Sequence, residues 1–314
     1  MTSKEKILSL LIKNADGFIS GEEMAKTLQI SRAAVWKSVK ALRSDGYVID
    51  AVTNKGYRLG EENDIITPEL IAANLQNDIE VLCYPTIDST NNEAKRLISS
   101  GKNNVFLVTA DEQTSGRGRQ GKSFYSPALT GVYMTLVLHP MSSLGNTVSA
   151  TTAAAVAVCR AVERLTDKKP QIKWVNDVYL GGKKICGILT EAITDFETQT
   201  VTSVVIGVGM NIRTVHFPSD VENAASLNAQ VKRSVLIAAI ADELCRVASS
   251  PASEFIDYYR THSMIIGEKI NFIKDRVVTP ATAVAIDENG GLTVRLESGE
   301  LTTLTSGEIS IRRI

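Results

Sequence analysis

A glycine-rich stretch at residues 116–123 places the strongest constraint on the fold. It reads GRGRQGKS and matches two phosphate-binding patterns, the dinucleotide fingerprint G-x-G-x-x-G and the P-loop G-x-x-x-x-G-K-[ST]. Both patterns need a strand that runs into the glycines and a helix that begins on them, because the helix N-terminus binds the phosphate. Here a polar stretch, 111–115, follows the apolar run 105–108, and residues 124–131 contain proline and glycine. The sequence therefore argues against both folds.

What remains is a loop that carries Arg117 and Arg119 between glycines. Glycine lets the backbone approach a ligand closely, and arginine offers a two-pronged donor to phosphate or carboxylate. We therefore predict a mobile anion-binding loop. A solvated basic surface turn is the alternative.

Residues 1–60 predict a winged helix. Apolar residues at helical spacing in 3–13 indicate a first helix, and helix-capping sequences begin at Ser20 and Ser31. The second and third helices are joined by a short turn, as in a helix-turn-helix. Two apolar runs around a turn at 53–56 predict the hairpin of the wing.

This N-terminal segment is basic although the whole chain has a net charge of −1. It holds ten Lys/Arg against six Asp/Glu, a local charge of +4. The third helix carries many of the basic residues away from its apolar stripe, which favours DNA binding. A small helical interaction module with a solvated charged face is the alternative. The residues expected to contact DNA are Ser31, Arg32, Lys37, Lys40 and Lys55.

An acidic run at 61–64 predicts a linker, after which helices and strands mix. Strands are expected at 81–84, 105–110, 131–138, 185–191 and 203–209. Helices are expected at 68–75, 90–100, 146–166 and 234–249. From residue 268 on, short Val/Ile/Thr-rich runs separated by glycine turns suggest a small β-barrel.

The cysteines and histidines are scattered, without metal-ligand spacing or a pattern of disulfide pairs. We found neither a signal-peptide core nor a membrane span, so a cytoplasmic location is expected.

A second group of polar residues lies in residues 173–191. Glycines 181 and 182 separate two apolar runs and predict a hairpin, in which Lys183 and Lys184 begin the second strand. Neighbouring lysines at a turn are usually solvated, but a lysine that enters so apolar a strand can point into the fold. A third segment, 206–212, is a strand interrupted by glycines, which often mark the close approach of a ligand or backbone.

Together these segments resemble the biotin protein ligases. The motifs that carry the resemblance are Ser89-Thr90-Asn91, residues 113–121, Lys173-Trp174-Val175-Asn176-Asp177, Lys184 before the apolar strand, and Gly209-Met210-Asn211. With the winged helix, the chain is similar to the bifunctional kind that also represses the biotin operon. Val175 replaces a proline that many members have, and Phe124 a tryptophan that some have.

The resemblance implies an α+β protein with three domains. These are a winged helix-turn-helix at 1–63, a mixed α/β catalytic domain at 64–266 and an SH3-like β-barrel at 267–314. It implies that biotin and ATP form biotinyl-5′-adenylate with Mg²⁺, and that biotin then passes to a lysine of a biotin carboxyl carrier protein. The implied partners are that carrier, operator DNA and a second copy in an adenylate-bound homodimer, with no membrane.

The resemblance also assigns roles to individual residues. The catalytic residues would be Lys184, Arg119, Arg117 and Asp177. Biotin would be bound by Ser89, Thr90, Asn91, Gln113, Arg117, Gly118, Arg119 and Lys184. The adenylate would be bound by Asn211, Phe124, Asn176 and Arg312. Ser89 could instead be only a helix cap. A lipoate-type acyl ligase and a ligand-responsive repressor without catalysis are the alternative functions.

Overall fold

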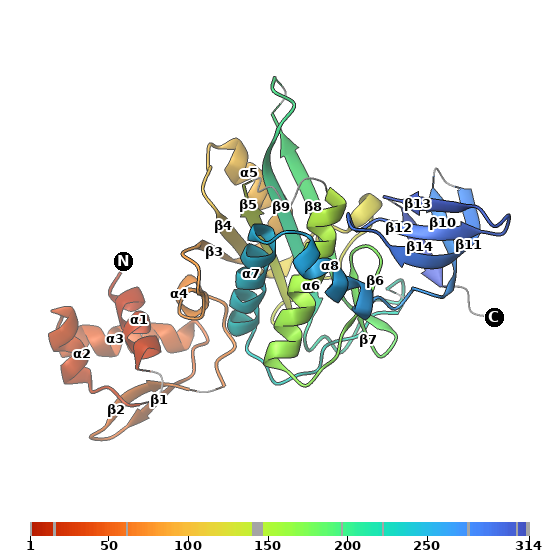
Figure 1. The fold of residues 1–314 in the computed structure, drawn as a ribbon. Coiled ribbons are helices and arrows are strands. Elements are labelled where there is room, and N and C mark those ends of the chain that lie inside the picture. The colour runs from red at the N-terminus through yellow and green to blue at the C-terminus, as the bar shows by residue number, and fades with distance from the viewer. Residues whose placement is uncertain are drawn as a thin grey trace.

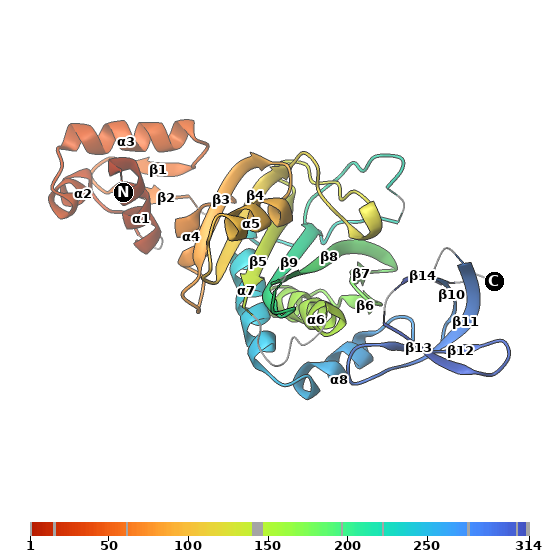
Figure 2. The same ribbon diagram turned by 90° about the horizontal axis from the view of Figure 1, so that it is seen from above.

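The computed structural model describes residues 2–14, 17–60, 62–139, 147–195, 197–221, 223–274, 277–305 and 307–311. Three bodies follow one another along the chain, with the central one between the other two (Figures 1 and 2). None of the described helices has the length and apolarity needed to cross a lipid bilayer.

The N-terminal body is the predicted winged helix. Helices α1 (Ser3–Lys13), α2 (Gly21–Leu28) and α3 (Arg32–Ser44) are followed by the hairpin of β1 (Ile49–Val52) and β2 (Gly56–Leu59). Ser20 and Ser31 cap α2 and α3, as predicted, through hydrogen bonds to the backbone of Glu23 and Ala34. The apolar faces of the three helices meet in one core.

Two neighbouring residues of the linker form hydrogen bonds to different bodies of the protein. The Asn63 side chain is bound to the backbone of Val48 and Gly60 in the winged helix, at 2.6–2.8 Å. Asp64 instead accepts hydrogen bonds from the backbone and side chain of Arg233 in the central body, at 2.6 and 3.1 Å. The acidic run is therefore a fixed joint at these two residues.

Arg233 is the largest buried side chain at this joint, and we expect its replacement to lower the free energy of unfolding. It is 1% exposed and paired with Asp64 and Asp111. Arg233→Met would leave Asp111 without this ion pair and Asp64 with Arg213 alone, so we expect the free energy of unfolding to fall by about 3–5 kcal/mol. Denaturant titration would measure the loss.

The matched control on the same helix is Arg246→Met. Arg246 forms an exposed ion pair with Glu243, so we expect its replacement to cost about 0–1 kcal/mol. Equal losses in the two variants would contradict a special role for the buried pair.

The central body is built on a seven-stranded mixed sheet in the order β3-β4-β5-β9-β8-β7-β6. Its strands are β3 (Glu80–Ile87), β4 (Phe106–Gln113), β5 (Gly131–Leu138), β6 (Gln171–Lys173), β7 (Asp177–Leu180), β8 (Lys183–Thr194) and β9 (Val201–Asn211). Only β3 and β4 are parallel; the other neighbours are antiparallel. All eight residues of β5 are buried, because this central strand is covered on both faces.

Helices cover the two faces of this sheet (Figure 1). One face packs against α6 (Thr147–Leu165) and α7 (Arg233–Ser249), and the other against α5 (Thr90–Ser99). The alanine-rich α6 is buried on nearly all sides. Two further helices, α4 (Pro68–Ala72) and α8 (Ser253–His262), lie toward the winged helix and the C-terminal body.

The C-terminal body is a five-stranded antiparallel sheet in the order β13-β12-β11-β10-β14. Its strands are β10 (Lys269–Lys274), β11 (Val277–Ile286), β12 (Leu292–Leu296), β13 (Leu301–Leu304) and β14 (Glu308–Ile311). The small β domain predicted from the glycine turns is therefore confirmed. Among the described residues β13 and β14 form the two edges of the sheet and do not pair with each other.

Some helices and strands have bounds that differ from those predicted from the sequence. The helix predicted at 68–75 ends already at Ala72. The strand predicted at 81–84 continues to Ile87 across a proline, which an edge strand tolerates because its outer N–H groups need no partner. The three-residue strand β6 was not predicted, because so short a run carries little pattern.

Candidate active site

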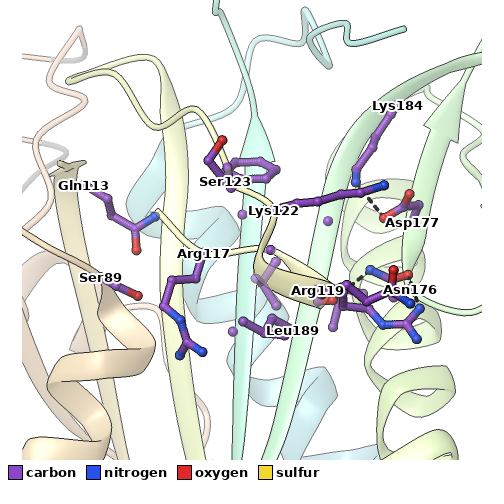
Figure 3. Close-up of a pocket in the computed structure, with 18 of the residues that line it drawn as sticks. Ser89, Gln113, Arg117, Arg119, Lys122, Ser123, Asn176, Asp177, Lys184 and Leu189 are labelled. Carbon is purple, nitrogen blue, oxygen red and sulfur yellow. Dashed lines mark hydrogen bonds and ion pairs between the residues drawn. The ribbon is translucent and has the colours of Figure 1, made fainter. Parts of the chain in front are cut away.

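A pocket opens on the sheet beside the glycine-rich loop (Figure 3). Its described lining residues are Ser89, Thr90, Gln113, Arg117, Gly118, Arg119, Gln120, Lys122, Ser123, Phe124, Asn176, Asp177, Lys184, Gly187, Ile188, Leu189, Gly207, Val208, Gly209 and Gly307. The loop crosses the pocket, with Ser89 and Gln113 on one side and Asn176, Asp177 and Lys184 on the other (Figure 3). Residues far apart in the sequence are thus gathered as predicted.

The glycine-rich loop folds as a short hairpin. The backbone N–H of Phe124 donates to Gly116 at 2.8 Å, and that of Gly118 donates to Lys122 at 2.7 Å. The tip, Arg119–Gly121, is a single 3₁₀ turn. No α-helix begins on the glycines among the described residues, which confirms that this stretch is neither a P-loop nor a dinucleotide fingerprint.

The two loop arginines are held by different parts of the body. An NH group of Arg117 lies 3.1 Å from the carboxylate of Glu191, at the far end of β8. Arg119 donates to the side-chain oxygen of Asn176 at 3.0 Å. Each arginine therefore fixes one side of the loop while still lining the pocket.

Glu191 binds several side chains around the pocket, a role that the sequence did not predict. Its carboxylate accepts from Asn91 and Lys95 at 2.9 Å each, in addition to Arg117. Burial by itself raises the pKa of Glu191, but the hydrogen bonds from Asn91 and Lys95 outweigh it, so the pKa is lowered. The carboxylate is therefore ionised at neutral pH and keeps Arg117 in place.

Ser89 does not act as a helix cap. It occupies the N-cap position of α5 without making the side-chain capping bond. Gln113 takes that role, because its Oε1 accepts from the backbone N–H of Thr90 at 2.9 Å. The capping alternative for Ser89 is thus removed, and its hydroxyl lines the pocket.

Two of the predicted ligand-binding residues lie behind the pocket wall. Asn91 is 4% exposed, and its Oδ1 lies 2.7 Å from the hydroxyl of Thr135, a buried residue of β5. Asn211 is also buried and donates to the carbonyl of Ala225 at 3.3 Å; its Oδ1 has no partner among the described residues. Neither lines the pocket. Arg312 lies outside the described residues.

The adjacent lysines of β8 differ as predicted. Lys183 is exposed, whereas Lys184 enters the pocket and its Nζ lies 2.7 Å from Oδ1 of Asp177, at the start of β7 (Figure 3). In the β7–β8 ladder Lys184 pairs with Tyr179, next to a register shift between Val178 and Tyr179. The main chain of Lys184 is also bound to Asn223 and Ala225, at 2.8 Å each. Lys184 is therefore held at both its backbone and its charged end.

The strand glycines make room for side chains, not for another backbone. A Cβ added at Gly209 would lie 2.7 Å from the ring of Phe124, and one at Gly187 would lie 3.4 Å from it. A Cβ at Gly207 would overlap the amide of Asn91. The sequence predicted close approach of a ligand or another backbone at these glycines, whereas the neighbours in the structure are the side chains of Phe124 and Asn91.

The charge of the pocket is unbalanced. Arg117, Arg119, Lys122 and Lys184 supply four positive charges, and Asp177 is the only carboxylate among the described lining residues. Such a site favours a polyanion such as a nucleoside triphosphate. Burial raises the pKa of the Cys186 thiol beside it, so this cysteine is unsuited to be a nucleophile.

No cluster of three His, Cys, Asp or Glu residues that could hold a metal occurs among the described residues. The four cysteines are free thiols.

The residues predicted to contact DNA lie on α3, at its N-cap and in the turn of the wing. Arg32, Lys37 and Lys40 are exposed on α3, and Lys55 is exposed in the turn of the wing. Ser31 is occupied in capping α3. The prediction omitted Trp36, which is 59% exposed on α3 with the ammonium of Lys40 5.4 Å from the centre of its ring.

Several pocket residues were also missed. Lys122 and Gly307 line the pocket, and Glu191 and Thr135 hold other residues from behind. Lys122 lies inside the motif and could have been included. Thr135 and Gly307 carried no local signal, because only the tertiary fold brings them to the site.

Comparison with known protein families assigns all three bodies. Residues 83–211 match the Biotin/lipoate A/B protein ligase family, residues 3–58 match an HTH domain, and residues 265–312 match the Biotin protein ligase C terminal domain.

Individual relatives agree with this assignment. The chain is 35% identical to the Bifunctional ligase/repressor BirA of Bacillus subtilis over 234 residues, which cover 73% of this chain and 71% of that protein. It is 28% identical to the protein of the same description from Escherichia coli, over 98% of this chain and 96% of that protein. A solved biotin protein ligase from Aquifex aeolicus, in complex with biotin and ATP, is similar with a TM-score of 0.63 and 25% identity; it covers 75% of this chain and 99% of that chain.

Proposed function

The chain belongs to the biotin protein ligase family, with a helix-turn-helix domain like that of the bifunctional ligase/repressors, and we propose that it makes biotinyl-5′-adenylate and transfers biotin to a carrier protein. The single observation that carries the proposal is the cationic pocket, in which two loop arginines and Lys184 face one cavity.

The first step joins a carboxylate to the α-phosphorus of ATP. A carboxylate oxygen of biotin attacks the phosphorus, the bond to the bridging oxygen breaks, and pyrophosphate leaves. Two anions must meet, so positioned cations are needed to offset their repulsion and to stabilise the charge that develops in the transition state. Arg117, Arg119 and Lys184 supply those cations.

The two sides of the pocket suit the two halves of the adenylate. The side with Ser89, Thr90 and Gln113 offers hydroxyl and amide groups suited to the ureido ring of biotin. The other side, with Asn176 and Lys184, offers polar and cationic groups for the phosphate. Phe124 would form an apolar wall beside the adenylate. We propose that Asn91 stabilises the biotin side of the pocket through its hydrogen bonds with Glu191 and Thr135. We also propose that Asn211 contacts the adenylate only if the segment after it shifts.

The second step needs a deprotonated lysine from the carrier protein. Its amine attacks the acyl carbon of the adenylate, AMP leaves, and the amine loses a proton. Asp177 is the carboxylate that lines the pocket and can help to accept this proton, because the carboxylate is already fixed beside Lys184.

Magnesium fits this pocket as an ion that arrives with the nucleotide. Mg²⁺ is commonly held by one or two carboxylates together with substrate phosphates, and Asp177, which is paired with Lys184, would be the carboxylate that holds it here. When bound, it would neutralise phosphate charge.

Transfer of labelled biotin to a biotin carboxyl carrier domain tests the proposal. We expect transfer that depends on ATP and Mg²⁺, with pyrophosphate released in the first step. Lipoate, offered in parallel, should not be transferred; preference for lipoate would assign the chain to lipoate-type ligases. Absence of pyrophosphate release with biotin would favour a repressor without catalysis.

We expect Arg119→Ala and Arg117→Ala to shorten the lifetime of bound adenylate. The loop crosses the pocket and is held by Arg119 to Asn176 and by Arg117 to Glu191. A charge-assisted contact of this kind contributes about 2–3 kcal/mol, or roughly 30- to 160-fold in lifetime. Release of radiolabelled AMP and of intact adenylate from preloaded enzyme gives the rate.

The control is Arg164→Ala, because Arg164 is exposed, is paired with Glu243 and does not line the pocket. If adenylate lifetime were unchanged in both loop variants, the loop would not be what retains the adenylate.

We also propose that the winged helix binds operator DNA as a homodimer when the adenylate is bound, in the cytoplasm. The exposed cations of α3 and the wing support this role. We propose domain boundaries at 1–63, 64–266 and 267–314, supported by the opposite attachments of Asn63 and Asp64.

A further inference from the structure

A hydrogen bond joins the C-terminal sheet to the motif at residues 173–177. The indole N–H of Trp174 donates to the carbonyl of Gly290 at 2.9 Å, between residues 116 positions apart. Trp174 is 3% exposed, so the bond is shielded from water. Unpaired indole donors are costly when buried, and the indole therefore has a strong preference for this partner.

The turn between β11 and β12 is built to present that carbonyl. Oδ1 of Asp287 accepts from the backbone N–H of Asn289 at 2.8 Å and of Gly291 at 2.7 Å. Gly290 has φ of +84°, which favours glycine, and a Cβ there would lie 2.7 Å from Thr152 of α6. The turn thus sits against α6 with no room for a side chain.

Neighbouring contacts seat the same turn on the central body. The hydroxyl of Ser149 donates to the Asn289 carbonyl at 3.2 Å, and Arg260 of α8 donates to the Ile286 carbonyl at 2.9 Å. The hydroxyl of Tyr259, on the same helix, donates to the Val175 carbonyl at 3.2 Å. The segment that follows Trp174 is therefore fixed from two sides.

The residues directly after this anchor belong to the pocket. Asn176 accepts from Arg119 through its side-chain oxygen, and its amide donates to the Ile188 carbonyl at 3.0 Å. Asp177 contacts Lys184 at 2.7 Å. A displacement of Trp174 would move both pairs, because only Val175 separates it from Asn176.

We propose that the β11–β12 turn, residues 287–291, is a positioning element for adenylate formation that acts through Trp174 on Asn176 and Asp177. The inference rests on the proposed ligase function and gives the C-terminal sheet a specific part in it. The biotin side of the pocket, on α5 and β4, lies on other elements and should not depend on the turn.

Steady-state kinetics of adenylate formation test whether the turn affects catalysis at Asn176 and Asp177 without affecting the biotin side of the pocket. Trp174→Phe removes the donor and keeps an aromatic ring. We expect kcat to fall about 10- to 100-fold, the range for small misplacement of catalytic groups, with the biotin KM within about twofold. Asp287→Ala should resemble it, whereas Asp287→Asn, which keeps the accepting oxygen, should restore most of the rate.

The matched control is Ser298→Ala, in the β12–β13 turn of the same sheet. There the backbone N–H of Glu300 donates to the hydroxyl of Ser298 at 3.4 Å. We expect its kcat to equal that of the parent.

Fluorescence provides a second readout that does not need activity. The chain has two tryptophans, so in a Trp36→Phe parent all indole emission comes from Trp174. Adding Asp287→Ala should shift this emission to longer wavelength as the indole gains water, and adding Asp287→Asn should not. Thermal melting of each variant shows that it is folded at the temperature of the measurement.

The two readouts separate the possible failures. An active parent whose Trp174→Phe variant keeps the parental kcat would overturn the positioning role, as would a biotin KM that rises as much as kcat falls. Emission unchanged by Asp287→Ala would show that the turn does not hold Trp174. A parent without adenylation would reject the proposed ligase function instead, because the emission shift is independent of catalysis.

Discussion

Lys184→Ala should slow adenylate formation about 10²–10³-fold, the usual cost of removing a positioned charge from a transition state. The expectation follows from the approach of Lys184 to the pocket, where its Nζ lies 2.7 Å from Asp177 and its backbone is bound on both sides. Loss of the ammonium would also leave Asp177 facing the incoming phosphates without its partner. Single-turnover release of pyrophosphate measures the chemical step directly.

Lys183→Ala is the matched control, because it removes the same side chain one position earlier. Lys183 is exposed and does not line the pocket, so we expect its rate to stay within about twofold of the parent. Equal and mild effects at both lysines would mean that neither acts on the transition state.

The sequence predicted those parts of the site that lie in continuous motifs. The glycine loop, the hairpin of Lys184 and the start of α5 each combine a turn signal with polar residues at fixed spacing, so their location could be inferred before their contacts were known. The structure confirms that they share one pocket.

The supporting contacts could not be predicted in this way. Glu191 lies at the end of a long strand, where an acidic residue is usually solvent-facing, and it becomes a hub only because Asn91, Lys95 and Arg117 converge on it. Asn91 matched the family motif, yet its neighbours turn its amide away from the cavity. Spacing along the chain does not reveal which of two adjacent polar residues will face a ligand.

The same distinction applies to the linker. The acidic run at 61–64 predicted a linker, because polar residues without periodicity usually form loops. Asn63 and Asp64 instead make side-chain bonds to two different bodies, through partners 15 and 169 positions away. Only the tertiary structure shows that this polar segment fixes the joint.

DNA binding by the adenylate-bound protein should be far more sensitive to salt than that of one winged helix. Each module exposes Arg32, Lys37, Lys40 and Lys55 on the surface of α3 and the wing. Each neutralised phosphate contributes about −0.9 to the slope of log K against log salt, so one module should give about −3.6 and two about −7. Between 50 and 200 mM salt, affinity should fall about 10²-fold for one module and about 10⁴-fold for two.

Fluorescence anisotropy with a labelled operator fragment, at several salt concentrations and with biotin and ATP present or absent, measures this slope. Lys55→Met should reduce it by about 2 if two modules bind and by about 1 if one does. Lys269→Met, an exposed lysine of β10, is the control and should leave the slope unchanged.

The slope also tests how the ligand acts. A ligand shifts an assembly equilibrium only through its different affinity for the two states, so the adenylate can promote repression only if it binds the dimer more tightly than the monomer. Couplings of this kind are commonly about 5- to 150-fold. Sedimentation in the same buffers should therefore show more dimer when biotin and ATP are present, and the steep slope should appear under the same conditions. A slope near −3.6 with the adenylate bound, together with a monomeric complex, would reject the dimeric repressor. The ligase proposal would still stand, because the pocket lies within one chain.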